Sequence, residues 1–210
     1  MKTYGFEQRT DEWFAIRCGI PTASSADKIL TPTGKLSAQS EAYLNQLLAD
    51  RAGYGDAPME PTEWMLRGIE LEPEARAMFE FAQGIKVRQV GFITNEEETA
   101  GCSPDGLADY WNEIDQGWEY YGFEVKCPKA STHFGYLRAG VLPPYYAPQV
   151  HFSMAVTGLP AWWFMSYFPG LDPLILQVER DEYTEKVAEA ITLFSARLEA
   201  EAERFGLPTR

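Results

Sequence analysis

The stretch GCSPDGLADYWNEIDQGWEYYGFEVK, residues 101–126, decides the fold of this chain. Its two ends, 101–110 and 118–126, are rich in residues that favour β-strands. A polar, turn-forming segment at 112–117 lies between them. The sequence therefore predicts two strands joined by a turn, and two strands connected in this way commonly pair as a hairpin.

Two carboxylates and a lysine in this hairpin form a candidate site. Side chains alternate along a strand, so Glu124 and Lys126 point to one face while Val125 points into the core. Asp105 lies in the turn signal Ser-Pro-Asp-Gly, and hairpin pairing places it beside Glu124. Two carboxylates at one point suit Mg²⁺ or Mn²⁺, with the Val125 carbonyl as a further ligand. The Lys126 ammonium then lies next to an attacking water or a phosphate oxygen.

Each half of this pattern also has a purely structural interpretation. Ser-Pro-Asp-Gly is an ordinary turn, and an acid and a lysine two residues apart are common on solvated strand faces. The setting of Glu124 favours chemistry instead, because Phe123 and Val125 flank it and a Cys-Pro pair follows Lys126. A buried central strand seldom carries two charges without a purpose.

The rest of the chain predicts helices around this hairpin and two later strands. Apolar spacing and capping signals indicate the following segments. Helices are expected at 11–18, near 22–24, and at 42–53, 62–83, 131–139, 145–157 and 181–205; strands are expected at 85–92, 161–168 and 174–179. Within 85–92 the apolar alternation changes phase, from Ile85 and Val87 to Val90 and Phe92. The sum is an α/β fold with a central mixed sheet flanked by helices, a helical N-terminal part and a single domain over 1–210.

The helix at 62–83 carries a more detailed expectation. Pro73 lies inside it and predicts a kink or a restart. Its buried side is expected to consist of Trp64, Leu71, Ala75, Met78 and Phe79.

The net charge of −13 argues against a broadly basic DNA-binding surface. The acids are unevenly placed, however. No Asp or Glu occurs between Val125 and Leu171, where Lys126, Lys129 and Arg138 lie. An acidic exterior around a less acidic groove is therefore expected, and bound cations would offset charge in that groove.

The three cysteines are too far apart for a recognisable disulfide or zinc pattern. There is no CxxC, and His133 and His151 are the only histidines. We expect reduced thiols in a cytoplasmic protein. No apolar run reaches the roughly 20 residues that a membrane-spanning helix needs, so no membrane association is expected.

An aspartate followed by Glu-x-Lys resembles the signature of the PD-(D/E)xK nuclease superfamily. More narrowly, the chain resembles the phage-lambda-type exonucleases, the viral recombinase-type alkaline exonucleases. The matching segments run in family order and cover most of the chain: WFAIRCGIPTAS (13–24), GIELEPEARAMFEF (68–81), GCSPDG (101–106), EVKCP (124–128) and QVHFSMAVT (149–157). The resemblance implies a restriction-endonuclease-like core.

The resemblance also implies roles for single residues. Asp105 and Glu124, assisted by the Val125 carbonyl, would hold two Mg²⁺ ions, with Mn²⁺ able to substitute, and Lys126 would act on the attacking water. Two further residues would complete the catalytic set, namely Glu72 and Gln149. By spacing alone, Glu72 is also compatible with a solvated acidic helix face.

Three residues match the family's pocket for a terminal 5′-phosphate, namely Arg17, Ser24 and Ser103. That role agrees with chemistry, because a guanidinium binds a phosphate through two hydrogen bonds and hydroxyls add neutral donors. By position alone, Arg17 is also compatible with a charge opposite the dipole of its helix.

The function implied is that of a Mg²⁺-dependent 5′-to-3′ double-strand DNA exonuclease, which leaves 3′ single-stranded overhangs for recombination by strand annealing. The substrates would be double-stranded DNA ends, the assembly a homotrimer ring, and a partner a single-strand annealing protein. Three alternatives stay open: another PD-(D/E)xK nuclease (a resolvase or restriction-type endonuclease), a glycoside hydrolase using paired carboxylates, and a non-catalytic DNA-binding module. No Walker-type phosphate loop occurs, so ATP dependence is not expected.

Overall fold

A five-stranded mixed sheet forms the centre of the computed structural model, which describes residues 1–55, 60–112 and 116–210. Its strand order is β2-β5-β6-β7-β8. The strands are β2 (Lys86–Arg88), β5 (Gly106–Asn112), β6 (Gly117–Lys126), β7 (Ala161–Ser166) and β8 (Leu174–Glu179). Only the β6–β7 pair is parallel, and the other pairs are antiparallel. The predicted α/β fold with a mixed sheet is confirmed.

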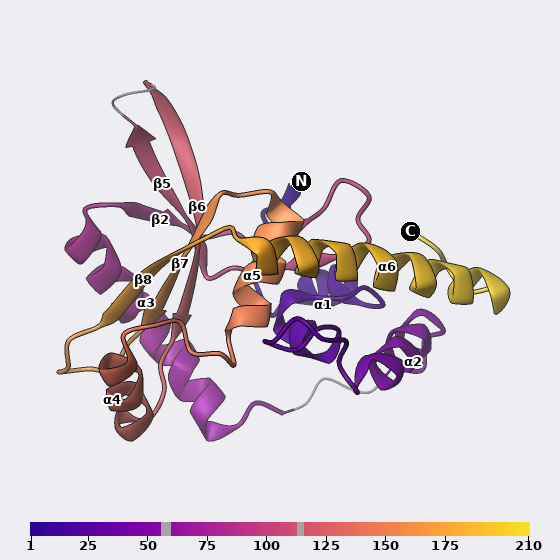
Figure 1. Cartoon of the computed structure of the whole chain (residues 1–210), viewed down its shortest axis with the longest axis horizontal. Coiled ribbons are helices and arrows are strands. Elements are labelled where there is room, and N and C mark those ends of the chain that lie inside the picture. Colours follow the sequence, from indigo (N-terminus) through magenta and orange to yellow (C-terminus); the bar gives the residue numbers. More distant parts are fainter. Residues whose placement is uncertain (56–59, 113–115) are drawn as a thin grey trace.

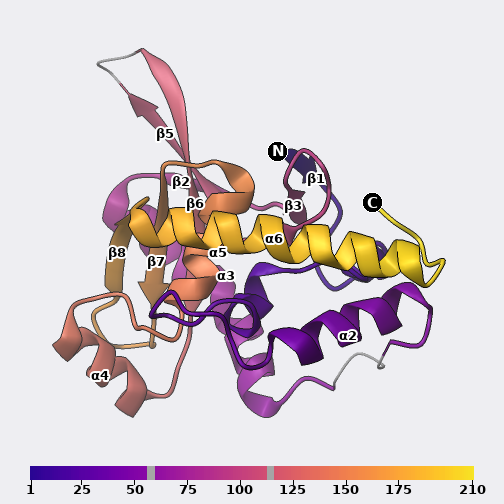
Figure 2. The same cartoon turned by 45° about the vertical axis from the view of Figure 1, so that its right-hand side comes forward.

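Helices cover both faces of this sheet. They are α1 (Asp11–Arg17), α2 (Ser40–Arg51), α3 (Glu63–Gln83), α4 (Ala130–Ala139), α5 (Ala147–Thr157) and α6 (Glu182–Arg204), with a 3-10 helix η1 at Ala23–Lys28. Figures 1 and 2 show α5 and the long α6 on one side of the sheet and α3 on the other. The predicted helices are therefore all present, the second of them as a 3-10 helix.

Strand alternation divides the apolar residues of the sheet between two cores. Trp162 and Phe164 face the side of α5 and α6, where they join the larger core. Phe123, Val125 and Met165 face α3 and form the smaller core. The central strand β6 is therefore buried on both faces, which makes the two charges that it carries unusual.

The predicted hairpin is present in the register that the site requires. β5 and β6 pair antiparallel, with Gly106 opposite Phe123. The connection expected at 112–117 joins them, although residues 113–115 lie outside the described part of the chain. The expectation of one strand over 101–110 was wrong, because β4 (Gly101–Cys102) and β5 are separated by Ser103, Pro104 and Asp105. Pro104 has no N–H to donate to a ladder, and the interruption leaves Asp105 in a loop between two strands.

The phase switch predicted at 85–92 marks a change of sheet. β2 joins the main sheet, whereas β3 (Phe92–Thr94) lies in a three-stranded sheet of order β1-β3-β4. The edge strand β1 (Lys2–Tyr4) was not predicted. At the break, a Cβ on Gly91 would lie 2.0 Å from the Phe6 carbonyl oxygen, so only glycine fits there.

Helix α3 continues through Pro73 as one helix, so of the predicted kink or restart the restart is excluded. Its expected buried side is partly wrong. Ala75 and Phe79 are buried as predicted, but Trp64 and Met78 are 49% and 38% exposed. The sheet covers only one narrow stripe of the helix, and Trp64 lies instead under the ammonium group of Lys129 at 4.3 Å. Leu71 is half-buried.

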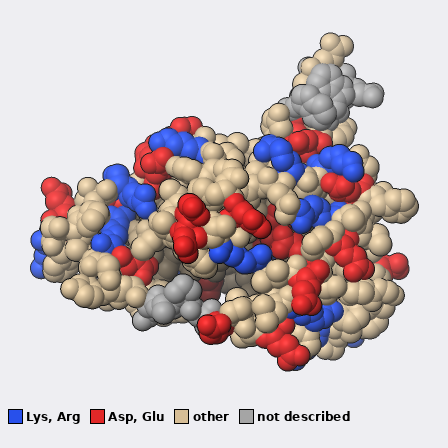
Figure 3. All heavy atoms as spheres, turned by 180° about the vertical axis from the view of Figure 1, so that it is seen from behind, with Lys and Arg blue, Asp and Glu red and all other residues tan. Residues whose placement is uncertain are grey.

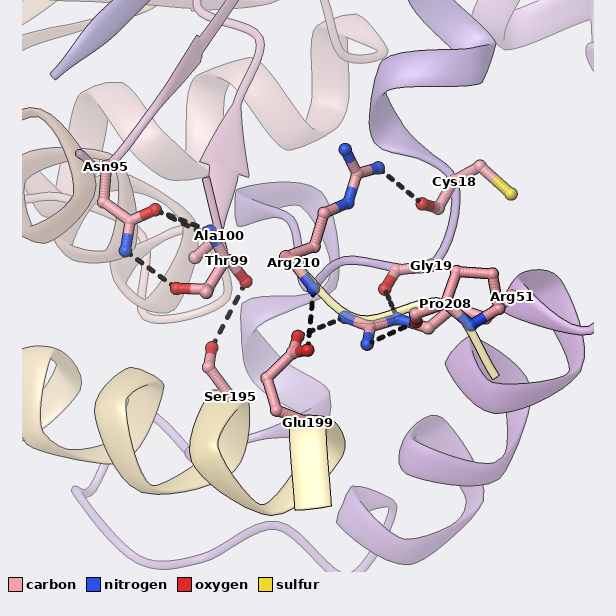
Figure 4. A network of polar contacts seen from close by, with 10 residues as sticks. All are labelled: Cys18, Gly19, Arg51, Asn95, Thr99, Ala100, Ser195, Glu199, Pro208 and Arg210. Atoms are coloured by element: carbon pink, nitrogen blue, oxygen red, sulfur yellow. Dashed lines mark hydrogen bonds and ion pairs between the residues drawn. The ribbon is translucent and has the colours of Figure 1, made fainter. Parts of the chain in front are cut away.

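The C-terminal segment returns to the N-terminal helices (Figure 4). The Arg51 guanidinium donates to the Gly19 carbonyl at 2.7 Å and to the Glu199 carboxylate at 2.5 Å. It also donates to the Pro208 carbonyl at 3.2 Å. The Arg210 backbone N–H donates to the same carboxylate at 2.9 Å, so one ion pair joins α2, α6 and the turn that ends α1.

All three cysteines are free, with Cys102 buried, Cys127 half-buried and Cys18 exposed. Among the described residues, the model contains no helix with both the length and the apolar character needed to cross a bilayer.

Candidate active site

Asp105 lies beside the central strand, as the sequence predicts. Its backbone N–H donates to the Phe123 carbonyl at 3.0 Å. Its carboxylate accepts a hydrogen bond from the Val125 N–H at 2.7 Å. The loop between β4 and β5 is thereby fixed to β6 on both sides of Glu124, although Asp105 and Glu124 are 19 residues apart in the chain.

Glu124 is the most buried acid of this group, at 3% exposure. Its Oε1 accepts hydrogen bonds from the Lys126 ammonium at 2.5 Å and from the Gln149 side-chain amide at 2.6 Å. Gln149 comes from α5, so the helix that covers the sheet also orients the carboxylate. Asp105, Glu124 and Lys126 are called the acid–lysine group below.

The charges in this group influence one another strongly. Burial and the neighbouring Glu124 carboxylate raise the pKa of Asp105 well above its usual range. Burial opposes the charge of Lys126, but the carboxylates of Glu124 and Asp105 overcome it and raise the pKa of that ammonium. The lysine therefore stays charged at neutral pH, and the two acids repel each other in a place that favours an added cation.

The donor set fits a hard divalent cation. Carboxylate and carbonyl oxygens are the ligands that Mg²⁺ and Mn²⁺ prefer. Asp105 and Glu124 provide the carboxylates. Burial and the Glu124 carboxylate raise the pKa of Asp105, and a bound cation would act in the opposite direction. Within the described ranges, no three Asp, Glu, His or Cys side chains form a ready-made metal cluster. A cation would therefore need backbone oxygen and water to complete its shell.

Glu72 lies at the edge of the same cleft. Two adjoining cavities, of about 310 and 420 Å³, are both lined by Glu72, Asp105 and Arg9. Lys126 and Val125 line the larger one. The sequence prediction that Glu72 stands near the acid–lysine group agrees with this arrangement, and the side chain is 17% exposed rather than part of a solvated helix face.

The three residues expected to bind a 5′-phosphate come together from separate segments. The Arg17 guanidinium, at the end of α1, donates to the Ser103 hydroxyl at 2.8 Å and to the Ser24 hydroxyl at 3.3 Å. Ser24 belongs to η1 and is exposed, so the group opens to solvent. Arg17, Ser24 and Ser103 are called the arginine–serine cluster below.

Arg17 has the properties of an anion-binding group. Within the described residues, no carboxylate pairs with it. Burial lowers its pKa to about 10, which leaves it charged at neutral pH. Its guanidinium carbon lies 4.0 Å from the centre of the Trp13 ring. A cation that is held on an aromatic face and lacks an acidic partner gains most from a bound anion.

Sequence reasoning missed several residues of these two groups. Trp13 donates its indole N–H to the Ser103 hydroxyl at 3.0 Å and so supports the cluster; its spacing of four residues before Arg17 on one helix was the available signal. Tyr146 lies under the Lys126 ammonium at 5.3 Å, one turn before Gln149 on the chain. For Gln8 and Arg9, which approach from the N-terminal loop, no sequence signal was present.

The surface shown in Figure 3 carries acidic and basic side chains side by side, without a broad region of one sign. The net charge of −13 is thus not gathered into one repelling face on this side of the molecule. This arrangement allows a local site for an anionic polymer in an acidic chain.

Comparisons with known proteins agree with this geometry. Residues 12–160 match the family model described as the YqaJ-like viral recombinase domain. The crystal structure of an alkaline exonuclease, LHK-Exo from Laribacter hongkongensis, matches with a TM-score of 0.78 and 32% identity, over 94% of this chain and 96% of that one. The structure of LHK-Exo in complex with dAMP matches with a TM-score of 0.77 and 31% identity, over 93% and 96%.

A more distant structure shares the fold. The phage-related exonuclease from Haemophilus somnus 129PT matches with a TM-score of 0.59 and 14% identity, over 87% of this chain and 96% of that one. No match was found among curated proteins. The three structural matches each span most of both chains, so the shared fold includes the sheet and the flanking helices.

Proposed function

The chain belongs to the YqaJ-like viral recombinase family and is a DNA exonuclease of that family, and we propose that it is a Mg²⁺-dependent enzyme that digests duplex DNA from its 5′ ends. One observation carries the proposal. The Asp105 carboxylate accepts from the N–H of Val125, the residue between Glu124 and Lys126. Two acids and an amine are thereby held at one point of a rigid sheet.

Each residue of the acid–lysine group has a distinct task. Asp105 and Glu124, with the Val125 carbonyl, would hold the cation. When bound, divalent cations supply an activated water and stabilise negative charge on the phosphate. The Lys126 ammonium, charged and anchored on Glu124, orients the attacking water and donates to a phosphate oxygen. Gln149 fixes the Glu124 carboxylate in place.

The family resemblance implies a second cation, and a different pair of acids would bind it. Asp105 and Glu72 line the same two cavities. Glu72 thus supplies a second carboxylate beside Asp105, or an acceptor for the water shell of the cation. Mn²⁺ has the same preference for oxygen ligands and substitutes for Mg²⁺.

The arginine–serine cluster supports 5′-to-3′ polarity. Ser103 is two residues before Asp105, so their Cα atoms lie within about 7 Å of each other. A terminal 5′-phosphate on the cluster is then about one nucleotide from the acid–lysine group. Cleavage at that spacing releases single nucleotides with a 5′-phosphate and leaves a 3′ single-stranded overhang. LHK-Exo, a relative with 31% identity in this comparison, has been solved with dAMP, which is a nucleotide of that class.

The expected assembly is a homotrimer ring that passes its 3′ overhang to a single-strand annealing protein. The family resemblance is the basis of this part of the proposal. Sedimentation of the purified chain measures it directly: a mass of three times 23.7 kDa supports the ring, and a monomer at all concentrations contradicts it.

End-labelled duplex DNA tests the proposed function. With Mg²⁺, the enzyme should degrade linear duplex to mononucleotides and spare a closed circle. Degradation should stop with EDTA and should begin at 5′ ends. Cleavage of the closed circle would favour a resolvase or restriction-type endonuclease, and digestion from 3′ ends would contradict the assigned polarity.

A further inference from the structure

Arg9 occupies a central place in the cleft. It lies in the loop between β1 and α1, and it lines both of the cavities that meet at Asp105 and Glu72. Its side chain is 49% exposed. A guanidinium group is therefore available at the surface of the same cleft that holds the acid–lysine group.

The contacts of Arg9 leave its hydrogen-bond donors free. Its Nη2 lies 3.6 Å from the Glu72 carboxylate, which is too far for a hydrogen bond. Arg76, one helical turn beyond Glu72, approaches the same carboxylate at 3.8 Å and is only 14% exposed. Since Arg76 already offsets the charge of Glu72, Arg9 is not required for that purpose. In the described part of the chain, its guanidinium makes no hydrogen bond, and such a group has five donors.

The backbone of Arg9 is held in an unfavourable conformation. Its φ is 72°, in the left-handed region where a residue with a Cβ is disfavoured and glycine is not. The preceding Gln8 fixes this loop, because its side-chain amide donates to the carbonyls of Val90 at 3.1 Å and Pro104 at 2.9 Å. Pro104 directly precedes Asp105. The loop is thus tied to the catalytic segment, and strain kept at such a place is typical of a residue whose side chain is needed.

We propose that Arg9 binds a backbone phosphate of the DNA strand that lies in the cleft. This inference rests on the nuclease function proposed above. The carboxylates of Glu72 and Asp105 line both cavities, and Lys126 is already bound by the Glu124 carboxylate. A phosphodiester that enters needs a cation with free donors, and a guanidinium binds phosphate oxygens through a pair of hydrogen bonds. The site is distinct from the arginine–serine cluster, which binds the chain end.

The salt dependence of DNA binding tests this role. Each phosphate contact adds about 0.9 to the slope of log affinity against log salt for duplex DNA, so losing one contact lowers the slope by that amount. We would measure binding of a 5′-phosphorylated duplex to the full-length protein at about 50 to 200 mM salt. Calcium would replace magnesium to keep oxygen-ligand coordination while limiting hydrolysis.

Three substitutions at one position separate charge, shape and folding. Arg9→Gln and Arg9→Gly should each lose about tenfold in affinity and about 0.9 in slope. Arg9→Lys should keep the slope, since the charge remains. It should lose part of the affinity, because lysine lacks the planar guanidinium that forms two hydrogen bonds with a phosphate. Arg9→Gly should unfold at the same or a higher temperature than the wild type, because glycine relieves the backbone strain.

Arg88 is the matched control. It is 51% exposed and lies 3.7 Å from Asp109, yet it lines neither cavity. Arg88→Gln should leave the salt slope unchanged. An unchanged slope in Arg9→Gln, or an equal loss in Arg88→Gln, would overturn the assignment of Arg9. A wild-type protein that does not degrade DNA would instead overturn the proposed nuclease function, so the two failures are distinguishable.

Discussion

The acid–lysine group lies on hydrogen-bonded neighbours of one sheet, whereas the arginine–serine cluster joins a helix end, a 3-10 helix and a loop through side chains. In the first group, the backbone bonds of Asp105 and Val125 fix the acids. In the second, the hydrogen bonds from Arg17 to two serine hydroxyls hold the three side chains together. Under the proposed function, catalysis is therefore assigned to the rigid sheet, and recognition of the DNA end to the segments packed around it.

This contrast also explains what the sequence could predict. Strand alternation and a 19-residue hairpin are local properties, so Asp105, Glu124 and Lys126 could be placed together from periodicity alone. Arg17 and Ser103 are 86 residues apart, and no local pattern brings them together. Only the family resemblance identified them, and the same holds for Glu72 and Gln149.

The errors in the fold have the same origin. The extra strand β1 and the separate three-stranded sheet depend on pairing between the N-terminus and residues near Thr94, which periodicity does not reveal. The exposed Trp64 was expected inside because it is large and apolar. The part of a helix that a sheet covers depends on tertiary packing, which the apolar pattern of the helix does not reveal. Trp64 lies outside the covered part.

The largest expected effect comes from breaking the rigid group. Lys126→Met approximates the length and packing of the side chain but removes the amine that, in the proposed mechanism, orients the nucleophile. We expect at least about a 10³-fold loss of cleavage rate with Mg²⁺. Single-turnover cleavage of end-labelled duplex measures it, and thermal unfolding checks that the fold persists. Activity within tenfold of the wild type would remove Lys126 from the mechanism.

Arg51→Ala should destabilise the packing of the segments that surround the arginine–serine cluster. Its side chain is 4% exposed and its partner Glu199 is 22% exposed, so a partly buried carboxylate would lose its ion-pair partner. We expect a loss of about 3 kcal/mol in unfolding free energy, measured by urea denaturation. The control is Arg197→Ala, whose ion pair with Glu41 is exposed and screened by solvent, so its loss should change the unfolding free energy much less. Equal losses in both variants would contradict the importance of this network.

Arg17→Ala should separate end recognition from chemistry. The loss of charged hydrogen bonds to a 5′-phosphate should slow cleavage of phosphorylated ends by about tenfold to a hundredfold. Cleavage of 5′-hydroxyl ends should change much less, because the acid–lysine group is intact. Rates on the two substrates, compared in one assay, give the answer. An equal loss on both kinds of end would show that the cluster does not bind the terminal phosphate.

The last expected effect appears only at alkaline pH and concerns Cys102, which precedes Ser103. Burial raises the pKa of this thiol to about 12, whereas in the unfolded chain it would ionise near pH 9. The unfolded state therefore releases the proton first as the pH rises, and stability should fall between about pH 9 and pH 12. In Cys102→Ala this fall should be less steep. Urea denaturation of both proteins at several alkaline pH values measures the difference. An identical decrease of unfolding free energy with pH in both proteins would contradict the burial of the Cys102 thiol.

A crystal soaked in Mn²⁺ tests the central claim most directly. Anomalous scattering from manganese locates the ion independently of the protein atoms. The account expects an ion in contact with the carboxylates of both Asp105 and Glu124, with the Lys126 ammonium beside it. A fully occupied manganese ion elsewhere, with none between these two carboxylates, would contradict it.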